Sequence, residues 1–178
     1  MSNRFLTPKE IVAQFPLNQG ATVADFGSGA GDFALVMAEK VGLSGRVFAF
    51  DILESALQSL RSKAKLQGHT NIDPVMADLE APKGSMLPDD SVDLVMIHNI
   101  IFQVDNKKNI LIEANRILKP EGILAVVEWD VSSPIGPLQD RRISEKDMTS
   151  MVLSYEYEIE RKIDAGKYHY GILYKSLV

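Results

Sequence analysis

The stretch VADFGSGAGDFA, residues 23–34, carries three glycines at alternate positions directly behind a short apolar run. The run is typical of a buried strand and residues 32–42 of a helix, so the glycines lie in the turn between them. One glycine is enough for a tight strand-to-helix turn, whereas three alternating glycines favour a backbone that a ligand approaches closely. Such turns lie at the carboxyl edge of a parallel sheet, where open α/β folds bind ligands beside a helix N-terminus.

The spacing around the glycines indicates the kind of ligand. The dinucleotide fingerprint is G-x-G-x-x-G, but Gly27, Gly29 and Gly31 follow G-x-G-x-G, and Asp25 stands two residues ahead of them. The next predicted strand ends in Asp51, 20 residues past Gly31, where an acid accepts hydrogen bonds from ribose hydroxyls. The spacing therefore predicts a ribose-containing ligand and does not require a phosphate.

Apolar strands alternate with amphipathic helices along most of the chain. We predict helices over 7–15, 32–42, 53–68 and 107–118, and strands over 22–27, 45–52, 72–78, 91–99 and 123–130, with a Pro-Glu-Gly turn at 120–122. This alternation indicates a parallel sheet covered on both faces. Residues 155–178 instead carry two alternating runs about the turn DAGK, which predicts a hairpin at one sheet edge. The fold class is therefore α/β, a single doubly wound, Rossmann-like sheet with a C-terminal antiparallel hairpin, in one domain over 1–178.

Composition and charge exclude several classes of function. The chain of 178 residues is 46% hydrophobic and has a net charge of −5, without a basic stripe for nucleic acid. It contains no cysteine, which excludes disulfides, cysteine nucleophiles and thiolate metal sites. Its three histidines are scattered, so no metal site is predicted. The apolar runs are too short to span a membrane and the start lacks a secretory pattern, so we expect a cytoplasmic protein.

Five short motifs in a fixed order resemble those of class I S-adenosylmethionine-dependent methyltransferases, near the ubiquinone/menaquinone-biosynthesis type. They are VADFGSGAG (23–31), VFAFDI (47–52), ADLEA (77–81), SVDLVMIHNI (91–100) and ILKPEGILAVVEW (117–129), and they cover nearly the whole chain. The resemblance implies a seven-stranded sheet whose last strand is antiparallel, S-adenosyl-L-methionine as the cofactor, and a small-molecule methyl acceptor. It favours no particular acceptor and no oligomeric state.

The resemblance implies that residues at the family's motif positions have the same roles in this chain. The turn formed by Gly27, Ser28, Gly29 and Gly31 would admit the methionine part of the cofactor, and Asp25 would face its ammonium group. Taken without the resemblance, Asp25 has the alternative interpretation of a buried turn acid.

The adenosine part of the cofactor would lie against the ends of the second and third strands. The resemblance implies that Asp51 holds the ribose hydroxyls and that Ile52 packs against the adenine. It also implies that Asp78 accepts from the adenine amino group and that Leu79 donates its backbone N–H nearby. The residues alone leave a helix N-cap open for Asp51 or Asp78, and a core position for Ile52.

His98 is the candidate catalytic residue, because it ends the fourth predicted strand, where the family contacts the methyl end of the cofactor. It is interpreted as a general base, a wall of the acceptor pocket or a hydrogen-bonded structural histidine, and all three stay open. Asn99 is a lesser candidate for the same pocket. We expect His69 at the surface and His169 to pack in an edge strand.

Two segments are candidates for covering the acceptor. One is MSNRFL at 1–6, and the other is 129–148, with Trp129 as an apolar wall and Arg141 or Arg142 as an anion clamp. The alternative for the second segment is a plain connection between two elements.

Other functions stay open beside methyl transfer. A non-catalytic S-adenosylmethionine-binding subunit that needs a partner is one. An NAD-dependent oxidoreductase would share the fold and the ribose-binding acid. It would also need G-x-G-x-x-G and a Tyr/Lys or His proton donor near the nicotinamide, which we do not find in the sequence. Aminopropyl transfer from the decarboxylated cofactor would need acidic residues for a polyamine, and Asp89 and Asp90 are its candidates.

Overall fold

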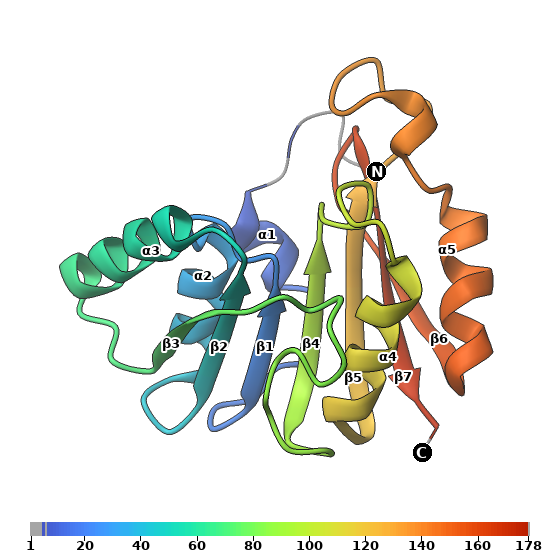
Figure 1. The fold of residues 1–178 in the computed structure, drawn as a ribbon. Helices are drawn as coiled ribbons and strands as arrows, with labels where there is room; N and C mark the ends of the chain where they lie inside the picture. Colours follow the sequence, from blue (N-terminus) through green and yellow to red (C-terminus); the bar gives the residue numbers. More distant parts are fainter. Residues whose placement is uncertain (1–4, 6, 178) are drawn as a thin grey trace.

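A computed structural model describes residues 5 and 7–177, so of the predicted N-terminal cover only Phe5 lies within the described part (Figure 1). Its strands form one seven-stranded sheet in the order β3-β2-β1-β4-β5-β7-β6. The strands are β1 (Thr22–Phe26), β2 (Arg46–Asp51), β3 (Ile72–Met76), β4 (Val92–His98), β5 (Leu118–Trp129), β6 (Tyr157–Ile163) and β7 (His169–Ser176). The first five pair in parallel, and β7 runs antiparallel to both β5 and β6. The predicted α/β fold with its C-terminal hairpin is confirmed.

Helices cover both faces of the sheet, which makes the fold doubly wound (Figure 1). They are α1 (Pro8–Val12), α2 (Asp32–Val41), α3 (Glu54–Gln67), α4 (Lys107–Ile117) and α5 (Glu145–Val152), with two 3₁₀ turns, η1 (Gln139–Arg141) and η2 (Leu153–Tyr155). Apolar residues of α1, α2 and α3 belong to one buried core, and those of α4 and α5 to the other.

Strand β4 shows how the sequence specifies two cores at once. Leu94 and Met96 pack into the core with α2, whereas Val95 and Ile97 pack into the core with α4. Successive side chains of a strand point to opposite faces, so a strand that is apolar throughout is buried on both sides. This is why the continuous apolar runs of the sequence predict internal parallel strands correctly.

The first helix begins as the sequence predicts and ends earlier. Thr7 caps α1, since its side chain accepts from the backbone N–H of Glu10 while the Glu10 carboxylate accepts from the N–H of Thr7. The helix ends at Val12 rather than at Phe15, as the prediction had it. The Lys40 ammonium of α2 donates to the carbonyl oxygens of Val12 and Phe15, at 2.9 and 2.6 Å. These bonds satisfy carbonyl groups that a longer helix would have used itself.

The predicted turn at 120–122 lies inside β5 as an irregularity. Val92 of β4 pairs with Leu118, and Leu94 pairs with Ile123, so the residues between them stand outside the regular ladder. Glu121 adopts φ +62° there. Strand β5 therefore begins earlier than the sequence predicts, because Leu118 pairs before the chain bulges.

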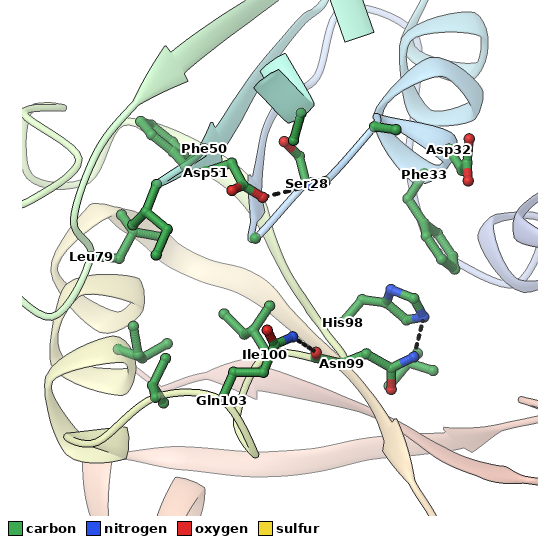
Figure 2. A pocket seen from close by; sticks show the side chains of 18 of the residues that line it. Ser28, Asp32, Phe33, Phe50, Asp51, Leu79, His98, Asn99, Ile100 and Gln103 are labelled. Atoms are coloured by element: carbon green, nitrogen blue, oxygen red, sulfur yellow. Dashed lines mark hydrogen bonds between the residues drawn. The ribbon is translucent and has the colours of Figure 1, made fainter. Parts of the chain in front are cut away.

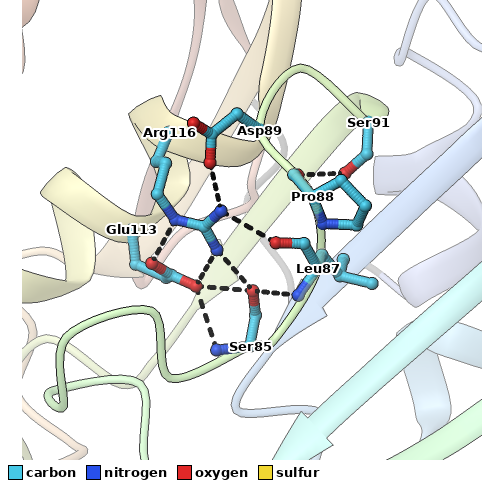
Figure 3. A network of polar contacts seen from close by, with 7 residues as sticks. All are labelled: Ser85, Leu87, Pro88, Asp89, Ser91, Glu113 and Arg116. Atoms are coloured by element: carbon cyan, nitrogen blue, oxygen red, sulfur yellow. Dashed lines mark hydrogen bonds and ion pairs between the residues drawn. The ribbon is translucent and has the colours of Figure 1, made fainter.

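A polar network ties the loop before β4 to α4 (Figure 3). Glu113 is 2% exposed and accepts from the backbone N–H of Ser85 and from the Arg116 guanidinium. Arg116 also donates to the carbonyl oxygen of Leu87 and to the Asp89 carboxylate. Burial works to raise the pKa of Glu113, but the hydrogen bonds from Arg116 and Ser85 outweigh it and lower that pKa. Asp89 thus serves this network, and neither Asp89 nor Asp90 lines the cleft described below.

Candidate active site

A cleft of about 1080 Å³ opens at the carboxyl edge of the parallel strands (Figure 2). Its walls come from the glycine turn after β1, from the segments after β2, β3 and β4, and from the facing ends of β5 and β7. The structure brings together there Gly27, Ser28, Gly29, Asp51, Ile52, Asp78, Leu79 and His98, whereas Asp25 and Gly31 do not line the cleft. Single-ligand pockets usually measure roughly 300–1,000 Å³. The cleft is therefore as large as the largest pockets of this kind.

The three glycines of the turn have different surroundings. A Cβ on Gly27 would lie 2.0 Å from Cγ2 of Ile100, and one on Gly31 would lie 2.2 Å from Cδ1 of Leu60. All three glycines have positive φ, and at Gly27 and Gly31 side chains of the protein itself also crowd the space of a Cβ. Gly29 has φ +54°, and a Cβ there would meet no atom of the described residues within 4 Å. Of the three, Gly29 is the one that presents bare backbone to open space.

Asp51 connects the glycine turn to the end of β2. Its Oδ2 accepts from the backbone N–H of Gly29 and its Oδ1 from that of Leu53, both at 2.9 Å. An ionised carboxylate has about four lone-pair sites, so two acceptor positions remain for a ligand. Asp51 lines the cleft (Figure 2).

Asp25 is the penultimate residue of β1, just before the turn, and is 2% exposed. Its Oδ2 and the hydroxyl of Ser28 are buried and have no hydrogen-bond partner among the described residues. Burial, and then the nearby charge of Asp51, raise the pKa of Asp25 to about 7. An unsatisfied buried polar group typically costs roughly 1–3 kcal/mol, and a cationic group held at the turn would remove this cost. The unsatisfied carboxylate oxygen lies next to the turn but outside the lining of the cleft.

The segment after β3 lines the cleft with side chains of different burial. Asp78 is exposed and its Oδ1 accepts from the N–H of Glu80 at 2.9 Å, so it caps its own turn while facing the cleft. Leu79 is 6% exposed. Ile52 is 67% exposed, which shows that its alternative interpretation as a core residue is wrong.

An aromatic cluster surrounds His98 at the other end of the cleft. The ring of Phe33, from α2, lies 4.2 Å from the His98 ring, and His169 lies 4.2 Å from Trp129, measured between ring centroids. His169 packs as expected, on Trp129, but its strand is not an edge strand, because β7 lies between β5 and β6. The pairing of Trp129 with His169 brings the first residue of β7 to the carboxyl edge.

Asn99 bridges the two cleft histidines. Its Nδ2 lies 3.1 Å from Nε2 of His98 and 3.1 Å from Nε2 of His169, and its backbone has φ +52°. With the amide as donor, both Nε2 atoms accept and both rings carry their proton on Nδ1. Burial lowers the pKa of His98 to about 3, with a smaller contribution from His169, and burial lowers the pKa of His169 to about 4. Both rings are therefore neutral at physiological pH.

Residues 130–142 fold against the cleft wall. A Cβ on Gly136 would lie 2.6 Å from the Trp129 ring, so this loop packs directly on the indole. Arg142 donates to the carbonyl oxygens of Ser133, Ile135 and Pro137 within the same loop. The interpretation of Arg142 as an anion clamp is wrong, since its guanidinium is used in holding the loop together, and Arg141 does not line the cleft. Trp129 and Phe5 do line it.

Within the described residues, no group of three or more His, Cys, Asp or Glu side chains is placed to hold a metal ion. Nor does any helix of the described part have the length and apolar character needed to cross a bilayer.

A parallel sheet with an antiparallel seventh strand, and a ligand cleft at the glycine turn after β1, define a Rossmann-like domain that binds small molecules at its carboxyl edge. The family profile described as "Methyltransferase domain" matches residues 17–169. A crystal structure of an S-adenosylmethionine-dependent methyltransferase from Aquifex aeolicus superimposes with a TM-score of 0.85 at 25% identity, over 94% of this chain and 88% of that one. The chain belongs to the class I S-adenosylmethionine-dependent methyltransferase family, as the motifs predict.

Similar curated proteins include ubiquinone/menaquinone biosynthesis C-methyltransferases UbiE. The one from Francisella tularensis subsp. novicida is 31% identical over 163 residues, 85% of this chain and 63% of that protein. The one from Hydrogenovibrio crunogenus is 36% identical over 121 residues, 67% of this chain and 46% of that protein. The chain thus spans between about half and just under two thirds of the length of these relatives.

Proposed function

We propose that the chain transfers a methyl group from S-adenosylmethionine to a small-molecule acceptor. The observation that carries this proposal is the cleft itself, in which a bare glycine backbone, a ribose-type acid and an aromatic cluster share one edge of the sheet. The volume of the cleft is large enough for a ligand of cofactor size, and the family to which the chain belongs uses this cofactor.

The residues of the cleft fit the cofactor from end to end. The bare turn at Gly29 suits the methionine part, and Asp25, buried just before that turn and outside the lining of the cleft, adds a carboxylate with an unpartnered oxygen. The remaining acceptor positions of Asp51 suit the ribose hydroxyls, and Ile52 and Asp78 suit the adenine. When bound, the cofactor supplies a methyl group that its own sulfonium activates.

The chain's own side chains then have to orient the acceptor and exclude water. Phe33, Trp129 and His169 form apolar and aromatic walls on the side of His98. Neutral His98 has its Nε2 lone pair directed at Asn99, and a pKa of about 3 lies far below the operating pH that suits a general base. We therefore favour His98 as a wall that positions the acceptor rather than as its base.

A flat aromatic acceptor of the quinone type is the finer proposal. The relatives are named as methyltransferases of ubiquinone and menaquinone biosynthesis and of demethylmenaquinone. The rings of Phe33, His98, Trp129 and His169 offer faces and edges against which a flat ring can stack.

A second candidate is a cofactor-binding subunit that needs a partner to complete the acceptor site. The observation that favours it is length, since the chain spans only about half to two thirds of its curated relatives.

The test combines binding with methyl transfer. Calorimetry should show S-adenosylmethionine and S-adenosylhomocysteine binding with dissociation constants within roughly 1 μM–1 mM, the range of metabolite sites. Methyl-labelled cofactor, offered with reduced quinone analogues, phenols and amines, should label an acceptor. Binding without transfer to any of them would favour the subunit, and a response to NADH without cofactor binding would overturn both proposals.

Gly29→Ala is expected to raise the dissociation constant for S-adenosylhomocysteine about tenfold or more, because the new Cβ enters space that the ligand needs. Gly68→Ala is the matched control, since Gly68 also has positive φ and no described atom within 4 Å, but ends α3 outside the cleft. Both variants bear left-handed strain of about 1–2 kcal/mol. Equal affinity of wild type and folded Gly29→Ala would show that no ligand approaches this backbone.

His98→Ala is expected to lower methyl transfer about tenfold without adding or removing a pH limb between about pH 5 and 8, because the ring is a neutral wall. His69→Ala, a histidine outside the cleft, serves as the control and should transfer at the wild-type rate. The measurement is the transfer rate against pH with saturating cofactor. A loss of roughly 10²–10⁴ together with loss of the acid-side limb would instead identify His98 as the base.

A further inference from the structure

A buried glutamate lies at the end of β5, behind the cleft. Glu128 is 2% exposed and does not line the cleft. Its Oε1 accepts from the backbone N–H groups of both Ile100 and Ile101, each at 2.9 Å. One carboxylate oxygen therefore satisfies two consecutive N–H groups of the loop that follows β4.

That loop carries a large part of the acceptor side of the cleft. Asn99, Ile100, Gln103 and Val104 all line it, and Asn99 holds the two histidines. The loop begins with a left-handed residue, since Asn99 has φ +52°. Inside the loop, the backbone N–H of Gln103 donates to the carbonyl oxygen of Ile100, and the side-chain amide of Gln103 donates to the carbonyl oxygen of Asn99. Its course toward the cleft thus depends on what holds Ile100 and Ile101.

The same loop touches the cofactor turn. A Cβ on Gly27 would lie only 2.0 Å from Cγ2 of Ile100, so the Ile100 side chain packs against the glycine turn. A shift of Ile100 therefore removes a wall from the glycine turn at the same time as it moves Asn99. The contacts join the two halves of the cleft through one side chain.

We propose that Glu128 is a positioning residue, which holds the loop of residues 99–104 so that its acceptor-side residues and the glycine turn keep one arrangement. Any effect of Glu128 on methyl transfer rests on the proposed function. The hydrogen bonds from Ile100 and Ile101 to Glu128 do not depend on that function. Glu128 touches neither ligand, since it lies outside the lining of the cleft.

The chemistry of the bond indicates which substitution preserves it. A glutamine carbonyl oxygen has two lone pairs and accepts two N–H groups as the carboxylate does, whereas leucine leaves both N–H groups without a partner. Burial raises the pKa of Glu128 to about 7, and the backbone donors lower it in part. A neutral side chain at this position is therefore compatible with the fold.

The experiment compares Glu128→Leu with Glu128→Gln by hydrogen exchange and by cofactor binding. In Glu128→Leu the amides of Ile100 and Ile101 should exchange about tenfold faster or more, because each loses its acceptor. The dissociation constant of S-adenosylhomocysteine should rise about fivefold or more, as expected for two coupled sites. Glu128→Gln should stay within about twofold of wild type in both measurements, since its carbonyl keeps both acceptor lone pairs.

Glu113→Gln is the control for loss of a buried carboxylate, because Glu113 lies in the network of Figure 3, away from the cleft. It should leave exchange in residues 99–104 and cofactor affinity unchanged. Should Glu128→Leu fail to fold, Glu128→Val repeats the test with a residue that suits a strand.

Unchanged exchange at Ile100 and Ile101 in the apolar variants would overturn the proposal, as would Glu128→Gln behaving like Glu128→Leu. If wild type binds no S-adenosylhomocysteine, the proposed function fails, and hydrogen exchange alone then decides the role of Glu128.

Discussion

Asp51→Ala is expected to weaken S-adenosylmethionine binding roughly 30- to 1,000-fold, equivalent to about 2–4 kcal/mol, by removing two charge-assisted hydrogen bonds to the ribose. The structure adds a second cause, because the Asp51 carboxylate also accepts from the backbone N–H groups of Gly29 and Leu53. The substitution should therefore remove the proposed contact with the ribose and also loosen the glycine turn. Isothermal titration calorimetry with S-adenosylhomocysteine measures the effect directly.

Asp93→Ala is the control, because it tests whether loss of any carboxylate that accepts from a backbone N–H would weaken cofactor binding. Asp93 also accepts from a backbone N–H, that of Thr22, but it lies at the start of β4, at the opposite edge of the sheet. Its removal should leave cofactor affinity unchanged. Asp51→Asn should fall between wild type and Asp51→Ala, because the amide keeps one acceptor oxygen. An unchanged dissociation constant in folded Asp51→Ala would show that another residue holds the ribose.

Arg116→Ala is expected to lower the free energy of unfolding by about 3–5 kcal/mol, because it leaves the buried carboxylate of Glu113 without its counter-ion. It also removes donors to Leu87 and Asp89, which hold the loop before β4 (Figure 3). For a chain of this size the melting temperature should fall by roughly 6–20 °C. Chemical denaturation gives the free energy, and calorimetric melting gives the temperature.

Arg46→Ala is the matched control, since Arg46 forms an ion pair with Asp73 in which both side chains are substantially exposed. Exposed pairs contribute about 0–1 kcal/mol, so this variant should be nearly as stable as wild type.

The effect of Arg116→Ala should depend on pH. The hydrogen bonds from Arg116 lower the pKa of Glu113 in the folded state. Their contribution to the free energy of unfolding is therefore fully present above the unfolded-state pKa of Glu113, and it is lost as the pH falls through the folded-state pKa. The difference between Arg116→Ala and wild type should therefore narrow below about pH 4. Equal stability of the Arg116 and Arg46 variants at neutral pH would contradict this account.

The fold and the side of the cleft at the glycine turn were predictable because their signals are local. Continuous apolar runs such as β4 specify strands buried on both faces, and the hairpin follows from the alternating pattern on either side of DAGK. Asp51 is predictable from its spacing behind the glycines, because the carboxyl ends of neighbouring parallel strands meet at one edge. The roles of the predicted cofactor residues in binding stay predictions until a ligand is measured.

The side of the cleft around His98 was decided by contacts between residues far apart in the sequence. His169 reaches the cleft because β7 inserts between β5 and β6 and pairs with Trp129, which no local pattern encodes. Glu128 reads in the sequence as one polar residue in an apolar strand, and its partners, Ile100 and Ile101, become visible only when the loop after β4 packs behind it.

In the glycine turn, the local sequence specifies some features and the tertiary structure decides others. Its sequence alone specifies a strand-to-helix turn at the ligand edge, since left-handed backbone conformations there need glycine. Only the tertiary structure distinguishes the glycines, because Ile100 and Leu60 press against two of them and leave Gly29 open. Periodicity and turn chemistry act over a few neighbouring residues and are written in the sequence, whereas a cleft is formed by side chains that strand order brings together.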